Sequence, residues 1–134
     1  MTEAEARAFV GRHSRAVLAT IKRDGRPQLS NIVYTLDDDG LIKISATGDR
    51  AKTRNLRKDP RASLSIVAEN WGEYLVVEGT CVVREENVLP ELRRVFERVS
   101  GKPHPNWPEF DAAMLRDGRV VLAITIDRMY PLNR

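Results

Sequence analysis

A short basic segment in the middle of the chain has the residue types and spacing of an anion site. Gly48 lies in a predicted turn, and cationic and amide side chains follow at Arg50, Lys52, Arg54, Asn55 and Arg57. These residues begin a predicted helix, so the free amides of its first turn and the cations can converge on one anion. The segment therefore predicts a phosphate-binding bend.

Two other interpretations of this segment remain open. A run of charges is often only the solvated face of a helix. Residues 50–61 hold six basic residues and one acidic residue, a local charge of +5 in a chain whose net charge is +3. A nucleic-acid site is disfavoured, because phosphate tracking normally uses a longer basic surface with aromatic side chains for base stacking. We therefore expect no nucleic-acid partner.

The sequence lacks the short signatures of the common enzyme classes. It contains no GxSxG nucleophile motif, Walker loop, GxGxxG or HExxH. Cys81 is the only cysteine, which excludes a disulfide framework and a cysteine-cluster zinc site, and we expect it to be buried in a strand. His13 and His104 lie 91 positions apart and form no metal-ligand pattern. No catalytic side chain is identified, so a cofactor is expected to supply any redox chemistry.

One tryptophan lies where its own chain offers it little to pack against. Trp71 falls in a predicted turn between two strands, residues 69–72. A large aromatic side chain in a tight turn is expected to cover a ligand or a partner subunit. The alternative is that Trp71 covers the end of its own barrel.

Hairpin turns and period-two patterns dominate the elements that must position these residues. Helices are expected at 2–12, 50–58, 88–99 and 109–116, and strands at 16–21, 28–36, 41–47, 61–68, 73–83 and 120–129. Because hairpins dominate and no βαβ repeat occurs, the sequence predicts a mainly β protein. The expected architecture is a six-stranded antiparallel barrel, closed or partly closed, with short flanking helices.

Length and composition fit one globular domain over residues 1–134. The chain is 42% hydrophobic and 31% charged, which is typical of a folded domain. No apolar run approaches the roughly twenty residues of a membrane span, so no membrane partner is expected. The first residues include glutamates and no contiguous apolar stretch, unlike a secretory signal. We therefore expect a cytoplasmic protein.

With these features in place, the sequence resembles the pyridoxamine-phosphate-oxidase-like split-barrel flavoproteins, and within them the branch that uses the deazaflavin coenzyme F-420. Residues 19–31 and 50–63 carry the resemblance. The turn at Trp71, residues 74–80 and the pair Met129 and Tyr130 support it, and the similarity covers nearly the whole chain. The resemblance implies a six-stranded antiparallel split β-barrel of the FMN-binding type.

The resemblance also implies a homodimer whose cofactor lies in a groove between the subunits. The residues that it implies beside the phosphate are Arg50, Ala51, Lys52, Thr53 and Asn55, with Ser45 on the adjoining strand. The residues that it implies beside the ring are Pro27, Gln28, Leu29, Ser30 and Asn31, and Trp71 is implied to arrive from the other subunit. By charge, Arg54 and Arg57 suit the acidic oligoglutamate tail of coenzyme F-420.

The implied function is an F-420-dependent oxidoreductase that transfers a hydride from the reduced deazaflavin to a small conjugated or quinone-like acceptor. FMN is the alternative cofactor, in a pyridoxamine-phosphate-oxidase-like oxidoreductase. A further alternative is a non-catalytic protein that binds and carries the deazaflavin. The sequence does not identify the acceptor, because contacts in such a groove are mostly apolar and depend on shape.

Overall fold

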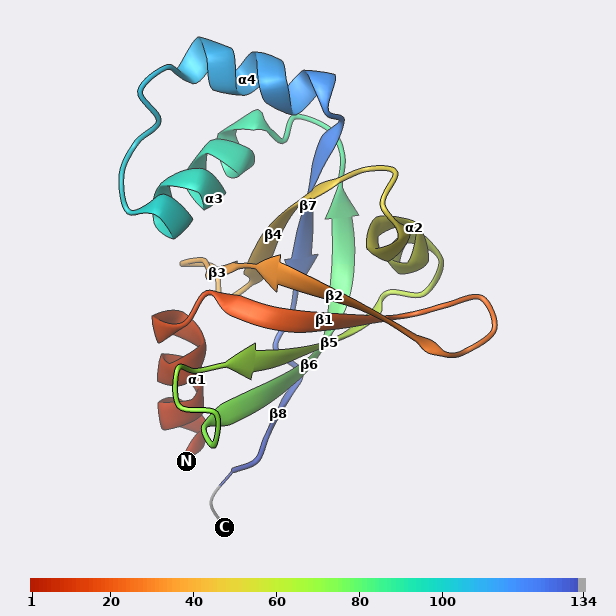
Figure 1. Cartoon of the computed structure of the whole chain (residues 1–134), viewed down its shortest axis with the longest axis vertical. Coiled ribbons are helices and arrows are strands. Elements are labelled where there is room, and N and C mark those ends of the chain that lie inside the picture. Colours follow the sequence, from red (N-terminus) through yellow and green to blue (C-terminus); the bar gives the residue numbers. More distant parts are fainter. Residues whose placement is uncertain (133–134) are drawn as a thin grey trace.

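The computed structural model describes residues 1–132, and Figure 1 shows a curled sheet with a two-helix lobe at one end. The last two residues of the predicted 1–134 domain lie outside the described residues. The helices are α1 (Glu3–Arg12), α2 (Ala51–Lys58), α3 (Leu89–Ser100) and α4 (Trp107–Arg116). The strands are β1 (Arg15–Ile21), β2 (Pro27–Val33), β3 (Thr35–Leu36), β4 (Ile42–Thr47), β5 (Arg61–Val67), β6 (Tyr74–Arg84), β7 (Arg119–Ile124) and β8 (Arg128–Tyr130).

The four predicted helices are confirmed, and side-chain caps mark the first residues of α1 and α4. The Thr2 side chain accepts the Glu5 amide at 3.1 Å, and Glu5 bonds back to the Thr2 amide, which is the capping box expected for α1. α4 begins two residues earlier than predicted, because the Asn106 side chain accepts the Glu109 amide at 3.1 Å. Within residues 1–132, no helix is long and apolar enough to cross a membrane.

The predicted count of six strands is wrong, because two of the predicted strands are each divided. The expected strand 28–36 consists of β2 and β3, separated by a bend at Tyr34. This side chain is completely buried, and its hydroxyl donates to the Val10 carbonyl at 2.8 Å. The Tyr34 amide donates to the Ser14 carbonyl, also at 2.8 Å. These bonds to the α1 region turn the chain out of β2, and no local sequence pattern reports them.

The expected strand 120–129 consists of β7 and β8, and the division lies where the chain crosses β6. At this crossing a Cβ on Gly79 would lie 1.8 Å from the Thr125 carbonyl oxygen, so only glycine permits the approach. The Thr125 amide donates to the Thr80 carbonyl at 3.0 Å. Beyond the crossing, β8 pairs with the first half of β6.

The sheet is antiparallel and curls at its longest strand. Its order is β2-β1-β5-β6-β7-β4-β3, with β8 beside β6. Residues 74–80 of β6 pair with β5, whereas residues 81–84 pair with β7, so β6 belongs to both halves. In the part of the chain that is described, β2 and β4 approach each other but no ladder joins them. We call this opening between β2 and β4 the seam. The curled antiparallel sheet with one opening confirms the predicted mainly β split barrel.

Two hydrophobic clusters form among the described residues. The larger one fills the inside of the curled sheet, and β1 and β5 alternate between buried and partly exposed positions along it. The smaller one lies under α3 and α4 and contains Leu92, Phe110 and Val121. Because Leu122 faces the larger cluster while Val121 faces the smaller one, β7 is buried on both faces.

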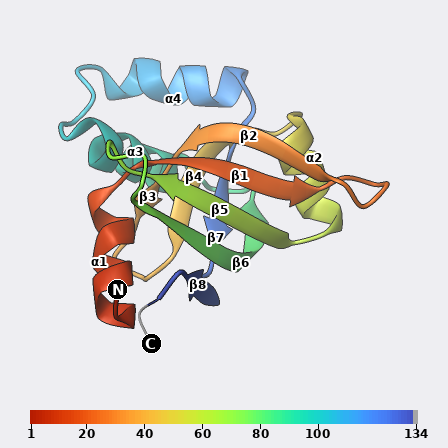
Figure 2. The ribbon, with the colours of Figure 1, turned by 60° about the horizontal axis from the view of Figure 1, so that its bottom comes forward.

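Buried ion pairs attach α3 to the hairpin that β3 and β4 form. Lys43, whose side chain is 2% exposed, lies 3.1 Å from Asp37, 3.1 Å from Asp39 and 2.7 Å from Glu91 of α3. Arg94 of α3 lies 2.6 Å from Asp37. Burial by itself raises the pKa of Asp37, but hydrogen bonds from Arg94, a main-chain amide and Lys43 outweigh it and lower the pKa to about 2. Figures 1 and 2 both show α3 next to β3 and β4.

Candidate functional site

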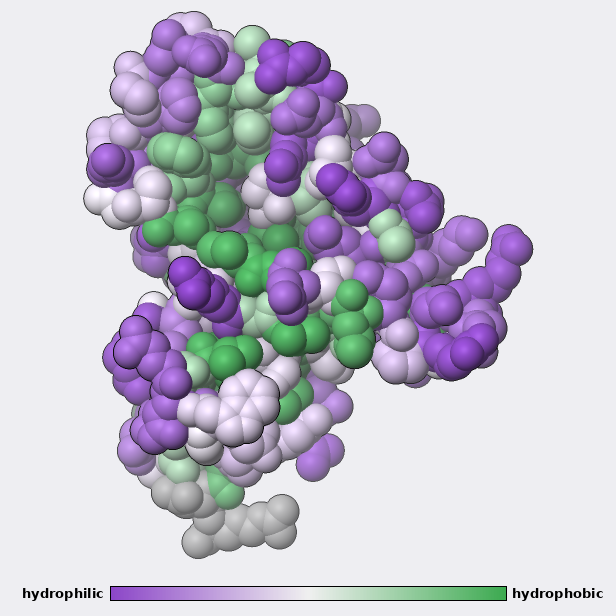
Figure 3. All heavy atoms as spheres, in the orientation of Figure 1, coloured by the Kyte–Doolittle hydropathy of each residue, from purple (hydrophilic) through white to green (hydrophobic). Residues whose placement is uncertain are grey.

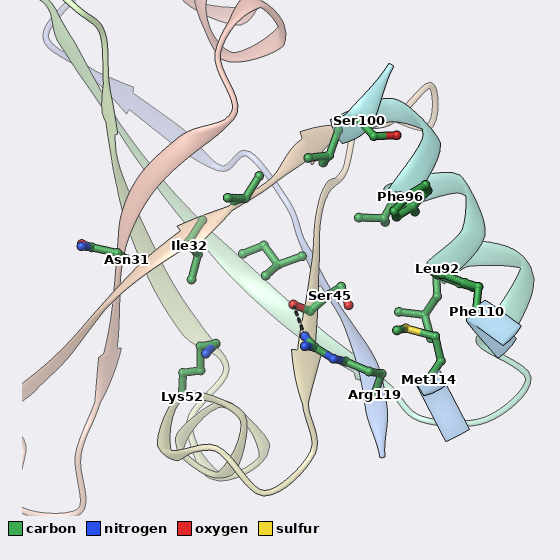
Figure 4. Close-up of a pocket in the computed structure, with 14 residues that line it drawn as sticks. Asn31, Ile32, Ser45, Lys52, Leu92, Phe96, Ser100, Phe110, Met114 and Arg119 are labelled. Atoms are coloured by element: carbon green, nitrogen blue, oxygen red, sulfur yellow. Dashed lines mark hydrogen bonds between the residues drawn. The ribbon is translucent and has the colours of Figure 1, made fainter. Parts of the chain in front are cut away.

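A cavity of about 430 Å³ opens at the seam, between the strands and the lobe that α3 and α4 form. Figure 4 shows its two unlike ends. Ser45 of β4, Lys52 of α2 and Arg119 of β7 supply polar groups at one end, and Asn31 of β2 lies at the rim. The opposite wall comes from α3 and α4 and is apolar. The cavity therefore combines a charged end with a hydrophobic wall, as ligand sites commonly do.

The charged end holds cations that no acidic side chain neutralises among the described residues. The Nη1 of Arg119 donates to the Ser45 carbonyl at 3.5 Å, a long contact, while its buried Nε has no hydrogen-bond partner within residues 1–132 (Figure 4). Burial lowers the pKa of Lys52, and the charges of Arg50 and Arg119 lower it further. An anion bound here would satisfy the Nε donor and relieve the repulsion.

The first turn of α2 adds main-chain donors to the same place. Arg50 is the N-cap residue, no side chain caps this helix, and its first turn contains no acidic residue. The first amides of α2 therefore remain available to an anion. Arg50, Arg54 and Arg119 also line an adjoining polar hollow, together with Asp49 and Asp117, so three cations and two carboxylates continue from the cavity over the bend.

The two surplus cations of the segment are not equivalent. Arg57 donates to the Gly48 carbonyl at 2.8 Å and pairs with Glu85 at 2.5 Å, so its charge is compensated and it supports the bend. Arg54 donates to the Asp49 carbonyl and lines the polar hollow. Of the two residues expected beside an acidic tail, only Arg54 therefore has an uncompensated charge on this surface.

Several predicted site residues lie in a hydrogen-bonded chain that crosses from α2 to β2. Asn55 Nδ2 donates to Thr20 Oγ1 at 3.1 Å, and Thr20 Oγ1 donates to Gln28 Oε1 at 2.8 Å. Gln28 Nε2 then donates to Ser30 Oγ at 2.8 Å. Thr53 is completely buried and its hydroxyl donates to the Thr47 carbonyl at 2.9 Å. These side chains hold α2, β1 and β2 in fixed relation, behind the surface of the bend.

The residues predicted beside the ring alternate between the two faces of β2. Gln28 and Ser30 point inward, toward the hydrogen-bonded chain, whereas Pro27, Leu29 and Asn31 are exposed on the outer face. Ser45 lines the cavity from β4, and Ala51 is exposed at the start of α2. The edge of β2 that faces the seam has no paired strand in residues 1–132. A ring along this strand would therefore meet main-chain groups as well as side chains.

Trp71 lies far from the cationic end of the cavity. Its side chain is 86% exposed at the tip of the turn between β5 and β6, so it does not cover its own barrel. Figures 1 and 2 both show this turn at the α1 end of the sheet, whereas α2 lies at the other end. One chain does not bring Trp71 and Lys52 together.

Two polar residues of this region were missed from the sequence. Arg119 reaches the site because β7 pairs with β4 in a register that sets Arg119 opposite Thr47. Its only local signal is a cation at the start of an otherwise apolar strand. Thr20 is 1% exposed, and its signal is a polar side chain at a position that strand alternation places inside. Cys81 is buried as predicted, and burial raises the pKa of its thiol to about 12.

Comparison with known proteins gives the same fold. The sequence profile of the family described as pyridoxamine 5'-phosphate oxidase matches residues 2–133. A conserved hypothetical protein from Mycobacterium tuberculosis has a TM-score of 0.77 and 28% identity, over 100% of this chain and 91% of that one. An F-420 reductase has a TM-score of 0.70 and 20% identity, over 92% and 94% of the two chains. A heme binding protein from Mycobacterium smegmatis has a TM-score of 0.69 and 24% identity, over 93% and 51%.

Proposed function

Because the chain belongs to the pyridoxamine 5'-phosphate oxidase family, we propose that it is an oxidoreductase that uses coenzyme F-420 bound at the seam. The proposed reaction is hydride transfer from the reduced deazaflavin to a small conjugated or quinone-like acceptor. FMN is the alternative cofactor, because both molecules present a phosphate that the same bend can bind. The relation to oxidoreductases rests on the family and on the fold shared with an F-420 reductase.

The observation that carries the proposal is the set of unneutralised cations at the end of an apolar cavity. Lys52 and Arg119 line this end, and Arg50 stands beside them at the open first turn of α2. No described residue accepts a hydrogen bond from the buried Nε of Arg119. A solvated helix face does not explain a half-buried lysine whose pKa is lowered by burial and by two neighbouring arginines. A phosphate group fits this donor set.

The residues divide into those that bind and those that position. Arg50, Lys52 and Arg119 would bind the phosphate, with the amides of α2 behind them. The chain from Asn55 through Thr20 to Gln28 would keep β2 at a set distance from the phosphate, which aligns the ring with the free edge of β2. When bound, the reduced cofactor supplies a hydride and a proton, which together reduce one double bond of the acceptor by two electrons.

We propose that the protein is a homodimer formed through the outer face of β2, β1 and β5. Leu29 and Val33 are 64% and 46% exposed there, and Val17 and Val67 lie partly exposed beside them. Figure 3 shows hydrophobic side chains gathered across the middle of this side of the molecule, and apolar patches of this kind commonly mark protein interfaces. The exposed Trp71 fits the same proposal, because only a second copy can bring it near Lys52.

A titration of the purified protein with coenzyme F-420 and with FMN, followed by cofactor fluorescence, tests the cofactor. We expect F-420 to bind more tightly, and reduced F-420 to be oxidised by at least one quinone in the presence of the protein. Tight binding of FMN alone would change the cofactor to FMN. Tight F-420 binding without turnover of any acceptor would support the carrier, and binding of neither cofactor would overturn the proposal.

Two substitutions test whether the cofactor phosphate binds at the start of α2. Lys52→Ala and Arg50→Ala should each weaken cofactor binding by about 1.5–3 kcal/mol, the range for a hydrogen bond to a charged group. Lys58→Ala is the matched control, because Lys58 is an exposed cation at the far end of the same helix. Unchanged affinity in both test variants would mean that the phosphate binds elsewhere.

Sedimentation equilibrium tests the homodimer. The unmodified protein should be dimeric, and Val67→Glu should shift it to a monomer because the change places a charge on the proposed interface. Val82→Glu is the control, since Val82 is 61% exposed on β6, outside the β2, β1 and β5 face. A monomeric unmodified protein, or equal effects of both variants, would contradict the proposed interface.

A further inference from the structure

The wall that α3 and α4 present to the cavity differs in chemistry from its charged end. It consists of Leu92, Val95, Phe96 and Val99 of α3 and Phe110 and Met114 of α4. Ser100, at the last turn of α3, is the one polar side chain that these two helices add to the described lining. Figure 4 shows Phe96, Leu92 and Met114 facing the strands across the space. A ligand on this wall is therefore held by apolar contact.

Aromatic rings support this wall from behind. The Phe96 and Phe110 ring centroids are 5.4 Å apart at 62°, and those of Trp107 and Phe110 are 5.3 Å apart at 89°. Edge-to-face packing of this kind holds rings in fixed orientations. Met114 adds a polarisable thioether, which packs favourably against aromatic rings. The wall therefore favours a flat conjugated molecule.

No charged side chain of α3 lines the cavity in the described part of the chain; four of the five are paired there, and the fifth, Glu97, is exposed. Glu91 binds Lys43 at 2.7 Å, and Arg93 binds Asp111 at 2.5 Å. Arg94 and Arg98 bind the hairpin between β3 and β4, as part of the network around Asp37. A charged ligand group on the apolar wall would find no partner there, and burying an unpaired charge is strongly unfavourable. With a phosphate on Lys52 and Arg119, no free cation faces this wall among the described lining residues.

The position of α3 does not depend on filling this space. The barrel core and the cluster under α3 and α4 are separate, and ion pairs to the hairpin hold α3 at a distance from β2. An apolar cavity of about 430 Å³ is thus kept open between two packed clusters. Its size lies within the range of small-molecule sites, about 300–1,000 Å³.

We infer that the α3–α4 wall is the acceptor side of the site and that it takes an uncharged, flat, conjugated ring. Its role in hydride transfer rests on the proposed function, whereas its binding of such a ring does not. Phe96 and Met114 are the contacts that select for this class of molecule. In the proposed function Lys52 and Arg119 would hold the cofactor phosphate at the charged end and β2 would lie beside the cofactor ring, so the two ligands would meet at the seam.

Binding of two matched probes tests the inference. 2-Naphthol is a neutral flat ring at pH 7, and naphthalene-2-sulfonate is its anionic counterpart. Each is titrated by calorimetry into protein saturated with whichever cofactor binds, or with inorganic phosphate if neither does. We expect 2-naphthol to bind at least about tenfold more tightly than the sulfonate, because the sulfonate must bury an unpaired charge. Equal or tighter sulfonate binding would overturn the neutral class.

Neighbouring residues of α4 supply a variant and its control. Met114→Glu should weaken 2-naphthol binding by about tenfold or more. Leu115→Glu should change it by no more than about twofold, since Leu115 is 70% exposed and outside the lining. If Met114→Glu does not fold, Met114→Gln is used in its place, and it should also weaken 2-naphthol binding. Unchanged naphthol affinity in the Met114 variant would overturn the inference.

Cofactor affinity separates this inference from the proposed function. FMN and F-420 should bind the Met114 variant as they bind the unmodified protein, and should not compete with 2-naphthol. Competition, or a parallel loss of cofactor affinity, would show that the cofactor ring occupies the wall and would overturn the acceptor assignment. Binding of naphthol without binding of either cofactor would overturn the proposed function and leave the wall as a site for neutral rings.

Discussion

Replacing Arg119 by methionine separates a ligand site from an ordinary surface charge, because the two predict opposite effects on stability. In the described part of the free protein, the buried Nε of Arg119 has no hydrogen-bond partner and its Nη1 makes one long contact of 3.5 Å. Its charge also lowers the pKa of Lys52. An unsatisfied buried donor costs about 1–3 kcal/mol. Arg119→Met removes that cost and keeps most of the side-chain volume. We therefore expect the free energy of unfolding of the variant to equal that of the unmodified protein or to exceed it by up to about 1 kcal/mol. Substitutions that remove a strained binding-site residue commonly stabilise a protein in this way.

The same substitution should weaken cofactor binding. Loss of one charge-assisted hydrogen bond costs about 1.5–3 kcal/mol, which is roughly a tenfold to hundredfold increase in Kd. Fluorescence titration measures the Kd, and chemical denaturation without ligand measures stability. Arg116→Met is the matched control, since the Arg116 side chain is 72% exposed and absent from the cavity lining. A variant that loses stability and keeps its affinity would show that Arg119 is structural, and would refute the reasoning.

Four further predictions concern charge and packing. The affinity for phosphate should fall as the pH rises through the lowered pKa of Lys52, because only the protonated amine binds the anion. Phosphate titrations at several pH values should show this dependence in the unmodified protein and not in Lys52→Gln. Lys43→Met should destabilise the fold by about 1.5–3 kcal/mol in denaturant, because it removes a buried cation that Asp37 and Glu91 share, while Arg94 and Arg84 still pair with those carboxylates. The pKa of Asp37 is about 2 instead of 3.8, so its contribution of roughly 2 kcal/mol is present above about pH 4 and is lost as the pH falls toward 2. Gly79→Ala should lower the free energy of unfolding by about 2–3 kcal/mol or more, because its Cβ would lie 1.8 Å from a carbonyl oxygen. Gly11→Ala is the control and should not destabilise the protein, because its Cβ would make ordinary contacts in α1.

Local signals in the sequence predicted most of the fold. Turn residues and alternation located every hairpin, and the capping box at Thr2 located the start of α1. The bend at Tyr34 and the crossing at Gly79 were missed for one reason. Each depends on a contact with a distant segment, the Val10 carbonyl in one case and Thr125 in the other. Alternating patterns report which face of a strand is buried, and they do not report where a tertiary contact ends it.

The same distinction between local and distant contacts separates the site residues that were predicted from those that were missed. Arg50 and Lys52 are near neighbours in the sequence at the start of one helix, so spacing alone brought them together. Arg119 joins them only because β7 lies beside β4, and that neighbour relation follows from the order of the whole sheet. The apolar wall was visible as a helix periodicity, but its facing a cavity depends on the ion pairs of Lys43. Residues that are close in sequence could be predicted, and those joined by topology could not.

The position of the site follows from the path of the chain at Tyr34. β2 and β3 are separated by this single residue, yet they lie at opposite ends of the sheet order. A chain that leaves one edge strand and at once begins the other must bring the two edges together, so the seam has to lie next to Tyr34. Unpaired strand edges that face water invite association with other chains. Here the edge of β2 faces a cavity with cations at one end, so the groups left unpaired by the split barrel are available to a heterocyclic ligand.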